Sequence, residues 1–387
     1  MRILHYIPYN FHSIDINKEY KSMLLHDVYS SDEYAIAENY SDFKQKAEKM
    51  KPEIIHIHAC WNISAYRVQH WAIKHRKVVV LSLHNRMQKW HVNHHRLLQK
   101  LPLLIVYQRK AIKNADAVLT STNTELVRMG KIGWNTRNSK IANALTTNGV
   151  SEEEMHAKLH DLYQKVIDSN PFRLMEQQDH QMEDAMIRAS VCVQDEKADL
   201  QAGNISDEQF RKILIHANNE GVLDEVVKGA ANMNLIVPHY ISNLMNNGID
   251  LFPQRLPKNT NPIERKKTIF KSRRNRTAMA NIKIDEKPTD AELQICIMFL
   301  NVKEEMKKKV LSRMHLVELF KSIRYSDYDE DMVQRMFKQL GIRKFAARML
   351  QVMKETYHLE EGFMPIFPIN DHKTDEIRKQ LFKLNIQ

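Results

Sequence analysis

Residues 51–62 read KPEIIHIHACWN, and the apolar run 54–58 inside this stretch is typical of a buried strand. Strands that alternate with helices of 10–20 residues indicate a parallel sheet covered on both faces. We therefore predict an α/β fold in which a Rossmann-like parallel-sheet domain occupies 1–148. The other predicted strands lie at 2–7, 34–37, 78–83, 117–121 and 140–143. The predicted helices lie at 18–28, 40–51, 64–75, 94–114 and 123–132.

The remainder of the chain changes in character after Val150. Ser151 precedes three acidic residues, as at the first turn of a helix, and helical periods continue to Gln387. Four prolines interrupt the segment 253–288, which is also strongly basic. We expect a helical region at 149–252, a basic linker or exposed arm at 253–288, and a helical C-terminal domain at 289–387.

Glycine and cysteine usage exclude several kinds of site. None of the 9 glycines precedes Gly130, which excludes a Walker P-loop and a G-x-G-x-x-G dinucleotide loop from the first domain. The 3 cysteines lie far apart and form no C-x-x-C pair, so we expect no disulfide framework. No segment reaches the roughly 20 apolar residues that span a bilayer, and no long apolar run follows Met1. We expect a cytoplasmic protein, or one at the inner face of a membrane.

The net charge of +11 is concentrated in the first 150 residues, which hold 22 Lys and Arg against 11 Asp and Glu. Within them, 54–115 hold 11 Lys and Arg and 8 His but no acidic residue. Such a field attracts anions, which include sugar nucleotides, lipid phosphates, membrane surfaces and nucleic acids. A basic surface that only keeps the protein soluble is the alternative.

Polar side chains gather where two predicted strands end, after 54–58 and after 78–83. Ligands of open parallel sheets bind outside the carboxyl ends of the strands. We therefore predict that His58, His84, Arg86 and Lys89 cluster at one anion-binding rim. Trp61 and Asn62 lie at the same end of the strand as His58.

Four blocks of this region occur in an order that is informative. They are PEIIHIHACW at 52–61, LSLHNR at 81–86, YQRKAIKNADAVLTSTNTE at 107–125 and IAN at 141–143. With these blocks, the sequence over 1–148 resembles the N-terminal half of the GT-B glycosyltransferases of family 4. That family commonly reads P-D-h-h-H-h-H-G-x-W, then S-P-H-G, then Y-Q-R-x-h-h-x-x-A-D. Its N-terminal half binds the acceptor, and the S-P-H-G histidine lies near the reacting sugar and the donor.

The resemblance implies roles for single residues. His84 takes the place of the S-P-H-G histidine and is the predicted catalytic residue. Arg86 would support the donor diphosphate, because a guanidinium suits phosphate oxygens. No metal and no cofactor is implied, since the nucleotide-sugar donor is a substrate. The predicted substrate-binding residues are His58, Trp61, Asn62, Arg86, Lys89 and Asn143.

The chain also departs from the family pattern. Asn85 stands where the family has the glycine of S-P-H-G, and residues 9–13 replace its Gly-Gly loop. The donor-binding second Rossmann domain is missing from the predicted elements. Its E-G-F-G signature is imitated at 361–363, but residue 369 is isoleucine where the second glutamate belongs. We interpret this short match as coincidental.

A second, weaker resemblance covers about 305–385. HLVEL at 315–319 and LGIRKFA at 340–346 resemble the helical tail of uncharacterised nucleotidyltransferase-like proteins, which occur beside bacterial polysaccharide genes. The acidic sequence DYDED at 327–331 could imitate a metal-binding D-x-D motif. We interpret it as the start of a helix, where acids cap the backbone and meet the helix dipole.

Two main classes of function remain open, and a basic scaffold on nucleic acid or a membrane is a third, weaker interpretation. The first is a glycosyltransferase of hexosyltransferase type in bacterial polysaccharide, capsule or glycoconjugate biosynthesis. It would move a sugar from a nucleotide-sugar donor to a glycan or lipid-linked acceptor, with peripheral membrane contact where the acceptor is a lipid. The alternative is a non-catalytic, degenerate glycosyltransferase half that binds a glycan intermediate or a partner glycosyltransferase. We expect no nucleic-acid partner, because the basic arm 255–283 offers only Phe270 for base stacking.

Overall fold

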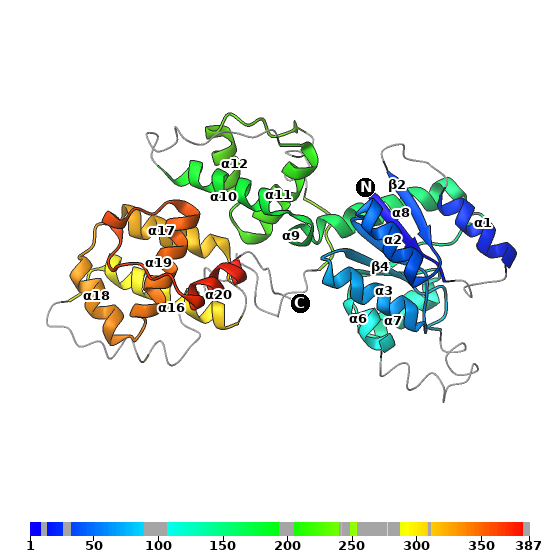
Figure 1. The fold of residues 1–387 in the computed structure, drawn as a ribbon, viewed down its shortest axis with the longest axis horizontal. Helices are drawn as coiled ribbons and strands as arrows, with labels where there is room; N and C mark the ends of the chain where they lie inside the picture. The colour runs from blue at the N-terminus through cyan, green and yellow to red at the C-terminus, as the bar shows by residue number, and fades with distance from the viewer. Residues whose placement is uncertain are drawn as a thin grey trace. The chain divides into compact units, whose positions relative to one another are not determined.

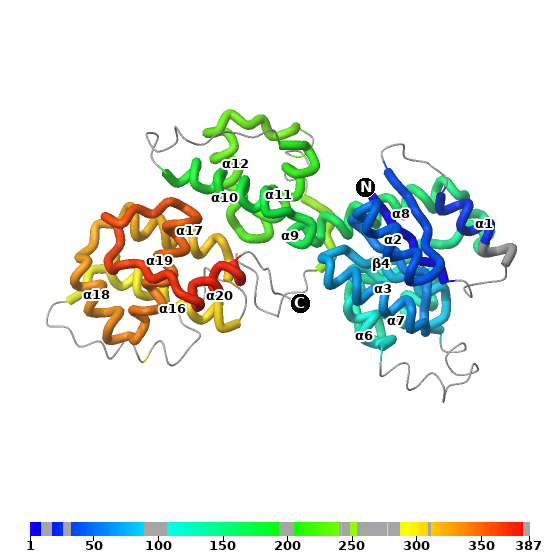
Figure 2. Tube along the Cα trace, in the orientation of Figure 1, coloured from blue at the N-terminus to red at the C-terminus, as the bar shows by residue number. Residues whose placement is uncertain are grey.

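The computed structural model consists of two compact units (Figure 1). The sheet unit comprises residues 1–174 and 249–254, and the helical unit comprises 175–248 and 255–387. The chain therefore leaves the sheet unit after 174 and returns to it briefly at 249–254 (Figure 2). The structure describes residues 1–8, 14–25, 32–88, 107–192, 205–239, 241, 248–253, 277, 287–308 and 311–381.

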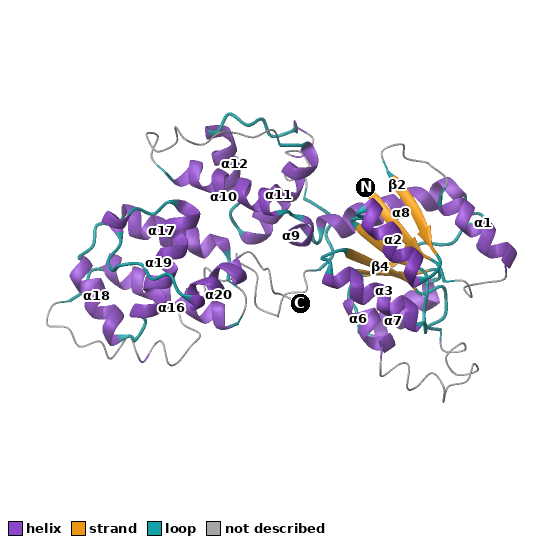
Figure 3. Cartoon of the chain, in the orientation of Figure 1, coloured by secondary structure: helices purple, strands orange, loops and turns teal. Residues whose placement is uncertain are grey.

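Six parallel strands form the sheet, in the order β2-β1-β3-β4-β5-β6. The strands are drawn in orange in Figure 3. In register, His5 of β1 lies opposite His56 of β3, which in turn lies opposite Val80 of β4. The predicted α/β fold with a parallel sheet is therefore confirmed. The strands are β1 (Arg2–Tyr6), β2 (Glu33–Ala37), β3 (Ile54–Ile57), β4 (Val78–Ser82), β5 (Ala117–Thr120) and β6 (Asn138–Lys140).

Helices cover both faces of the sheet, as continuous apolar strands require. Side chains such as Leu4 and Ile57 pack on one face with residues of α2, α3, α6 and α7. Side chains such as Ile3 and Val80 pack on the other face with residues of α1 and α8. The helices are α1 (Ile14–Leu24), α2 (Tyr40–Met50), α3 (Ile63–Lys74), α6 (Arg109–Asn114), α7 (Asn123–Ile132), α8 (Glu152–Asp168) and α9 (Pro171–Leu174).

The sheet unit extends beyond the predicted boundary at 148. Helix α8 lies in this unit because Leu159, Tyr163 and Val166 are buried against the same sheet face as Ile3. Ser151 caps α8 as predicted, since its hydroxyl accepts the N–H of Glu154. The helical period after Val150 was correctly predicted, but periodicity does not show which core a helix covers.

The last strand is displaced from its predicted position. Strand β6 spans Asn138–Lys140, whereas the sequence pattern predicted 140–143. Of the residues predicted to form this strand, only Ile141 is buried, and the three residues of β6 are polar and exposed or half-buried. A short edge strand of this kind lacks the apolar pattern by which strands are recognised in a sequence.

Within the predicted helix 94–114 the structure has α6 at Arg109–Asn114, and residues 94–106 lie outside the described part of the chain.

The helical unit is built around its own apolar core. Gly229 of α12 lies so close to α10 that an added Cβ would come within 1.7 Å of the Met186 carbonyl oxygen. Glycine is therefore required where these two helices meet. The helices are α10 (Gln177–Val191), α11 (Asp207–Glu220), α12 (Leu223–Asn232), α16 (Asp290–Lys307), α17 (Arg313–Tyr325), α18 (Glu330–Gln339), α19 (Arg343–Tyr357) and α20 (His372–Leu381).

Two short acidic motifs of the helical unit have structural roles. Asp329 is the N-cap of α18, where its carboxylate accepts the Asp331 N–H at 2.8 Å. The predicted helix start at this acidic triplet is thereby confirmed. The E-G-F match at 361–363 forms a 3₁₀ turn that follows α19.

Most of the predicted linker 253–288 lies outside the described residues. Among the described helices, none has the length and apolar character needed to cross a membrane.

Candidate functional site

The candidate site lies at the carboxyl edge of the central strands. From β1 the chain first adds β2 on one side and then β3 on the other, so the strand order reverses between β1 and β3. In open α/β sheets, ligands bind outside the carboxyl ends of the strands at such a reversal. The segments that leave β3 and β4 here are 58–62 and 83–87.

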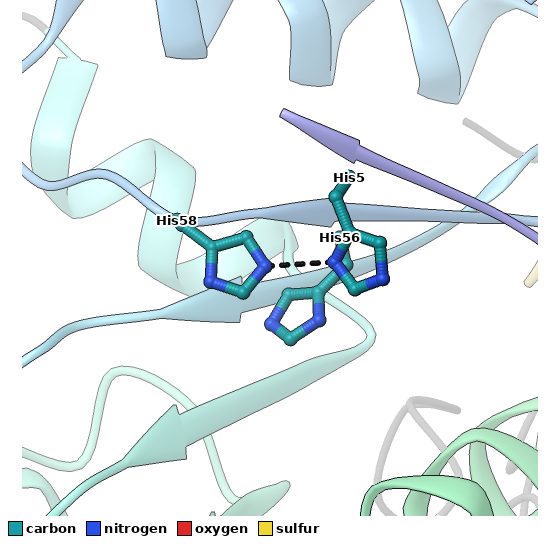
Figure 4. Close-up of side chains that lie close together, drawn as sticks. All are labelled: His5, His56 and His58. Carbon is teal, nitrogen blue, oxygen red and sulfur yellow. Dashed lines mark hydrogen bonds between the residues drawn. The ribbon is translucent and has the colours of Figure 1, made fainter. Parts of the chain in front are cut away.

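Three histidines from β1 and the end of β3 are packed together on one face of the sheet (Figure 4). His5, His56 and His58 are buried, and their nearest ring nitrogens all lie within 4.8 Å of one another. The Nδ1 atom of His5 is 2.9 Å from Nε2 of His58. The cluster continues to the end of β4, because Nδ1 of His58 is 3.2 Å from Nε2 of His84.

Hydroxyl groups surround these imidazoles. His56 bonds the Tyr163 hydroxyl through Nδ1 at 2.6 Å and the Ser82 hydroxyl through Nε2 at 2.7 Å. The Tyr20 hydroxyl of α1 lies 3.2 Å from Nδ1 of His58. Burial raises the pKa of the Tyr20 and Tyr163 phenols, so both hydroxyls keep their protons.

The buried imidazoles are neutral. Desolvation lowers the pKa of His5 to about 3, and the neighbouring His156 acts in the same direction. Desolvation also lowers the pKa values of His56 and His58 far below the usual range, with further lowering by the other histidines of the cluster. Neutral imidazole donates one hydrogen bond and accepts one, which suits a hydrogen-bonded chain.

Neutral imidazoles are also metal ligands, but the ring geometry of this cluster favours hydrogen bonding. The rings of His56 and His58 lie 3.9 Å apart, centre to centre, at an angle of 32°. Zinc requires lone pairs that converge on one point about 2.0 Å from each nitrogen. Here Nδ1 of His5 and Nε2 of His58 face each other at 2.9 Å, a hydrogen-bond distance. Both nitrogens of His56 are also engaged by hydroxyls.

The loop that carries His84 has an unusual backbone. His84 and Asn85 have φ values of 50° and 63°, in the left-handed region that few residues other than glycine adopt. The buried Glu125 carboxylate holds this loop by accepting the N–H groups of Asn85 at 3.1 Å and Met87 at 3.2 Å. Strained backbone that is fixed in this way is typical of functional sites.

Trp61 and Arg86 join the two loops of the site. Trp61 also has a left-handed backbone, with φ of 59°. Its ring Nε1 donates to the Arg86 carbonyl oxygen at 3.2 Å, and its backbone N–H donates to the Gln108 side chain at 2.7 Å. Arg86 is half-buried. The segments that follow β3 and β4 therefore contact each other, as the sequence analysis predicts.

The other predicted binding residues have different surroundings. The side chain of His58 is 0% exposed, so it does not reach a ligand directly, and one of its contacts is the half-buried His84. Asn62 caps α3 by accepting the Ala65 N–H at 2.9 Å. Asn143 follows β6, two strands away from β4, and its side chain accepts the Leu145 N–H. Lys89 lies outside the described residues.

Several residues of the site were not predicted from the sequence. His5 is a single histidine in an apolar strand, and only the register of β1 and β3 brings it to His56. Tyr20 and Tyr163 come from helices far away in the sequence. Glu125 is the last residue of the block 107–125, and the family resemblance implies no role for it. Its position at the first turn of α7, after the carboxyl end of β5, was the available signal.

Comparisons of the chain with protein-family models, with curated protein sequences and with solved structures give no match. The chemistry must therefore be inferred from the site. At this edge of the sheet the half-buried residues His84 and Arg86 lie next to the buried, neutral His58, which contacts His84. Such a set can donate hydrogen bonds and compensate negative charge.

Proposed function

We propose that the sheet unit binds a nucleotide-sugar at the carboxyl edge of β1, β3 and β4, as part of a glycosyltransferase of the GT-B family 4 type. One observation carries this proposal. A buried histidine, His58, supports a half-buried one, His84, where the strand order reverses, and Arg86 follows in the same loop. The reaction would serve polysaccharide or glycoconjugate biosynthesis, with a glycan or lipid-linked acceptor.

Glycosyl transfer separates a positively charged sugar from a leaving diphosphate. Arg86 and His84 would stabilise the negative charge that develops on the diphosphate, because preorganised donors act strongly in a partly desolvated site. Residues 54–115 contain no carboxylate, and the oxygens of Glu125 are engaged by two backbone N–H groups. A mechanism with a pair of catalytic carboxylates is therefore not supported by these segments.

A non-catalytic binding protein is the second candidate, and the helical unit favours it. GT-B enzymes bind the donor with a second Rossmann domain, whereas the elements described within 175–381 are helices and one 3₁₀ turn. In this case the sheet unit would hold a glycan intermediate, or a partner glycosyltransferase would complete the donor site. Both candidates use the same edge of the sheet.

The charge at Arg86 provides the first test. We expect Arg86→Ala to weaken binding of the best UDP- or GDP-sugar by about tenfold to a hundredfold, since a hydrogen bond to a charged group contributes about 1.5–3 kcal/mol. Titration calorimetry on the full chain measures this change in Kd. Arg2→Ala is the control, because Arg2 is exposed and is the first residue of β1, at the amino edge of the sheet.

Equal weakening by both arginine substitutions would point to a diffuse basic surface and would contradict a specific site. Binding that falls steeply with salt and shows no preference among sugars would support the same conclusion. Binding without turnover would favour the non-catalytic candidate.

A further inference from the structure

The loop 83–87 is joined to the first turn of α7 by side chains of both segments. The Glu125 carboxylate accepts the N–H groups of Asn85 at 3.1 Å and Met87 at 3.2 Å. In the other direction, the side-chain oxygen of Asn85 accepts the Thr122 hydroxyl at 2.8 Å. We call these three hydrogen bonds the loop clamp. The clamp connects the segment after β4 to the helix after β5, within the sheet unit.

Glu125 stands at a position where glutamate commonly caps its own helix. Thr122 is the N-cap of α7, and Glu125 follows three residues later, which is the spacing of a capping box. In α16, which has the same spacing, Glu292 accepts the N–H of the cap residue Thr289 at 2.6 Å. In α7 the carboxylate instead reaches across to the N–H of Asn85. The Glu125 side chain therefore serves the loop rather than the start of its own helix.

The clamp couples a buried charge to a strained backbone. Glu125 is 0% exposed, so burial raises its pKa, whereas the N–H groups of Met87 and Asn85 lower it. A buried carboxylate is costly unless hydrogen-bond donors surround it. His84 and Asn85 have left-handed backbones, which persist only where the surrounding structure holds them. The same hydrogen bonds offset both costs, so opening the loop would expose both at once.

The residue type at position 85 fits this clamp. Asparagine adopts left-handed angles more readily than most residues that have a side chain. The Asn85 side-chain oxygen also accepts the Gln88 amide at 3.2 Å, in addition to the Thr122 hydroxyl. Glycine, which the GT-B pattern has at this place, could adopt the backbone angles but could not make these bonds. The clamp therefore gives a physical reason for the asparagine.

We propose that Glu125 and Asn85 are positioning residues, which fix the loop 83–87 before a ligand binds. They hold Arg86 and His84 ready for an anion. This role rests on the proposed function, in which the anion is the diphosphate of a nucleotide-sugar. A loop that is already ordered spares the ligand the entropic cost of ordering it. Loss of the clamp therefore weakens binding even though the fully buried Glu125 does not touch the ligand.

Amide hydrogen exchange tests the clamp without any ligand. Glu125→Gln keeps the shape of the side chain but replaces one acceptor oxygen by an NH₂ group, which cannot accept an N–H. We expect exchange at Asn85 or Met87 to become at least about tenfold faster in this variant, with β4 and β5 unchanged. Unchanged exchange at both amides would overturn the proposal.

Glu292→Gln is the matched control for this substitution. Glu292 is also buried three residues after an N-cap, and its carboxylate also accepts two backbone N–H groups, those of Thr289 and Asp329. Because it lies in the helical unit, its substitution should leave exchange at Asn85 and Met87 as in the wild type.

Asn85→Gly tests the other half of the clamp. Glycine tolerates the left-handed angles, so this variant adds no backbone strain, but it removes the bond to the Thr122 hydroxyl. We expect faster exchange at Met87, because the loop is held from one side only. Exchange at the wild-type rate would contradict the role of Asn85.

Nucleotide-sugar binding tests what the clamp positions. Glu125→Gln should weaken binding of the best UDP- or GDP-sugar by about tenfold, and this factor should be at least about threefold smaller in the Arg86→Ala background. Equal weakening in both backgrounds would make Glu125 a purely structural residue and would overturn its positioning role. If no nucleotide-sugar binds the wild type, the proposed function fails, whereas amide exchange still decides for or against the clamp.

Discussion

His84→Ala is expected to lower the turnover of a nucleotide-sugar by about 10²-fold or more, the usual contribution of one charge-stabilising or proton-handling group. The imidazole is half-buried, and its Nε2 lies 3.2 Å from Nδ1 of His58. Loss of this contact should by itself change stability little, because the Tyr20 hydroxyl remains at the same nitrogen of His58. Steady-state kinetics and the thermal midpoint of the same variant measure both effects.

The left-handed backbone at His84 calls for a second variant. With φ of 50°, alanine is strained at this position, whereas asparagine adopts such angles more readily. We expect His84→Asn to lose as much turnover as His84→Ala and to keep a thermal midpoint closer to that of the wild type. A lowered midpoint with unchanged binding and turnover would instead make His84 a structural residue.

Acidification is expected to destabilise the sheet unit specifically. His5, His56 and His58 are neutral when folded, with pKa values far below the 6.5 of an unfolded histidine. Below pH 6.5 the unfolded chain binds protons that the folded chain does not. The contribution of these three groups to the free energy of unfolding is therefore fully present above pH 6.5 and is lost as the pH falls. Three such groups would remove about 4 kcal/mol of unfolding free energy between pH 7.5 and 5.5.

Amide hydrogen exchange can locate this loss. We expect protection of β1 and β3 to fall between pH 7.5 and 5.5, after correction for the pH dependence of intrinsic exchange. His56→Gln should reduce the pH dependence of this protection by about one third, since one of the three titrating groups is removed. His70→Gln on the exposed side of α3 is the control and should leave it unchanged. Protection that is independent of pH in the wild type would show that the cluster is not neutral by burial.

The parallel sheet and the place of the site could be predicted from the sequence. Strand β3 consists of four buried residues, and Pro52 and Asn62 lie on either side of its apolar run, so both its type and its position are marked locally. In a parallel sheet the segments after β3 and β4 must emerge at the same edge. His58 and His84 were therefore expected to meet, and they lie 3.2 Å apart.

The support behind His84 could not be predicted, because it depends on register and packing. A shift of one residue between β1 and β3 would turn His5 to the other face of the sheet. Tyr163 reaches His56 only because α8 belongs to the sheet unit, which helical periodicity alone does not reveal. The burial of His58 likewise follows from contacts that no local pattern encodes.

The most direct test of the proposed function is a titration of UDP- and GDP-sugars into the wild-type full chain and into His84→Ala. We expect one nucleotide-sugar to bind the wild type at a single site, and to bind His84→Ala at least about tenfold more weakly, since one hydrogen bond to a charged oxygen is lost. Equal affinity for both proteins, or the absence of saturable binding to the wild type, would contradict a nucleotide-sugar site at this edge of the sheet.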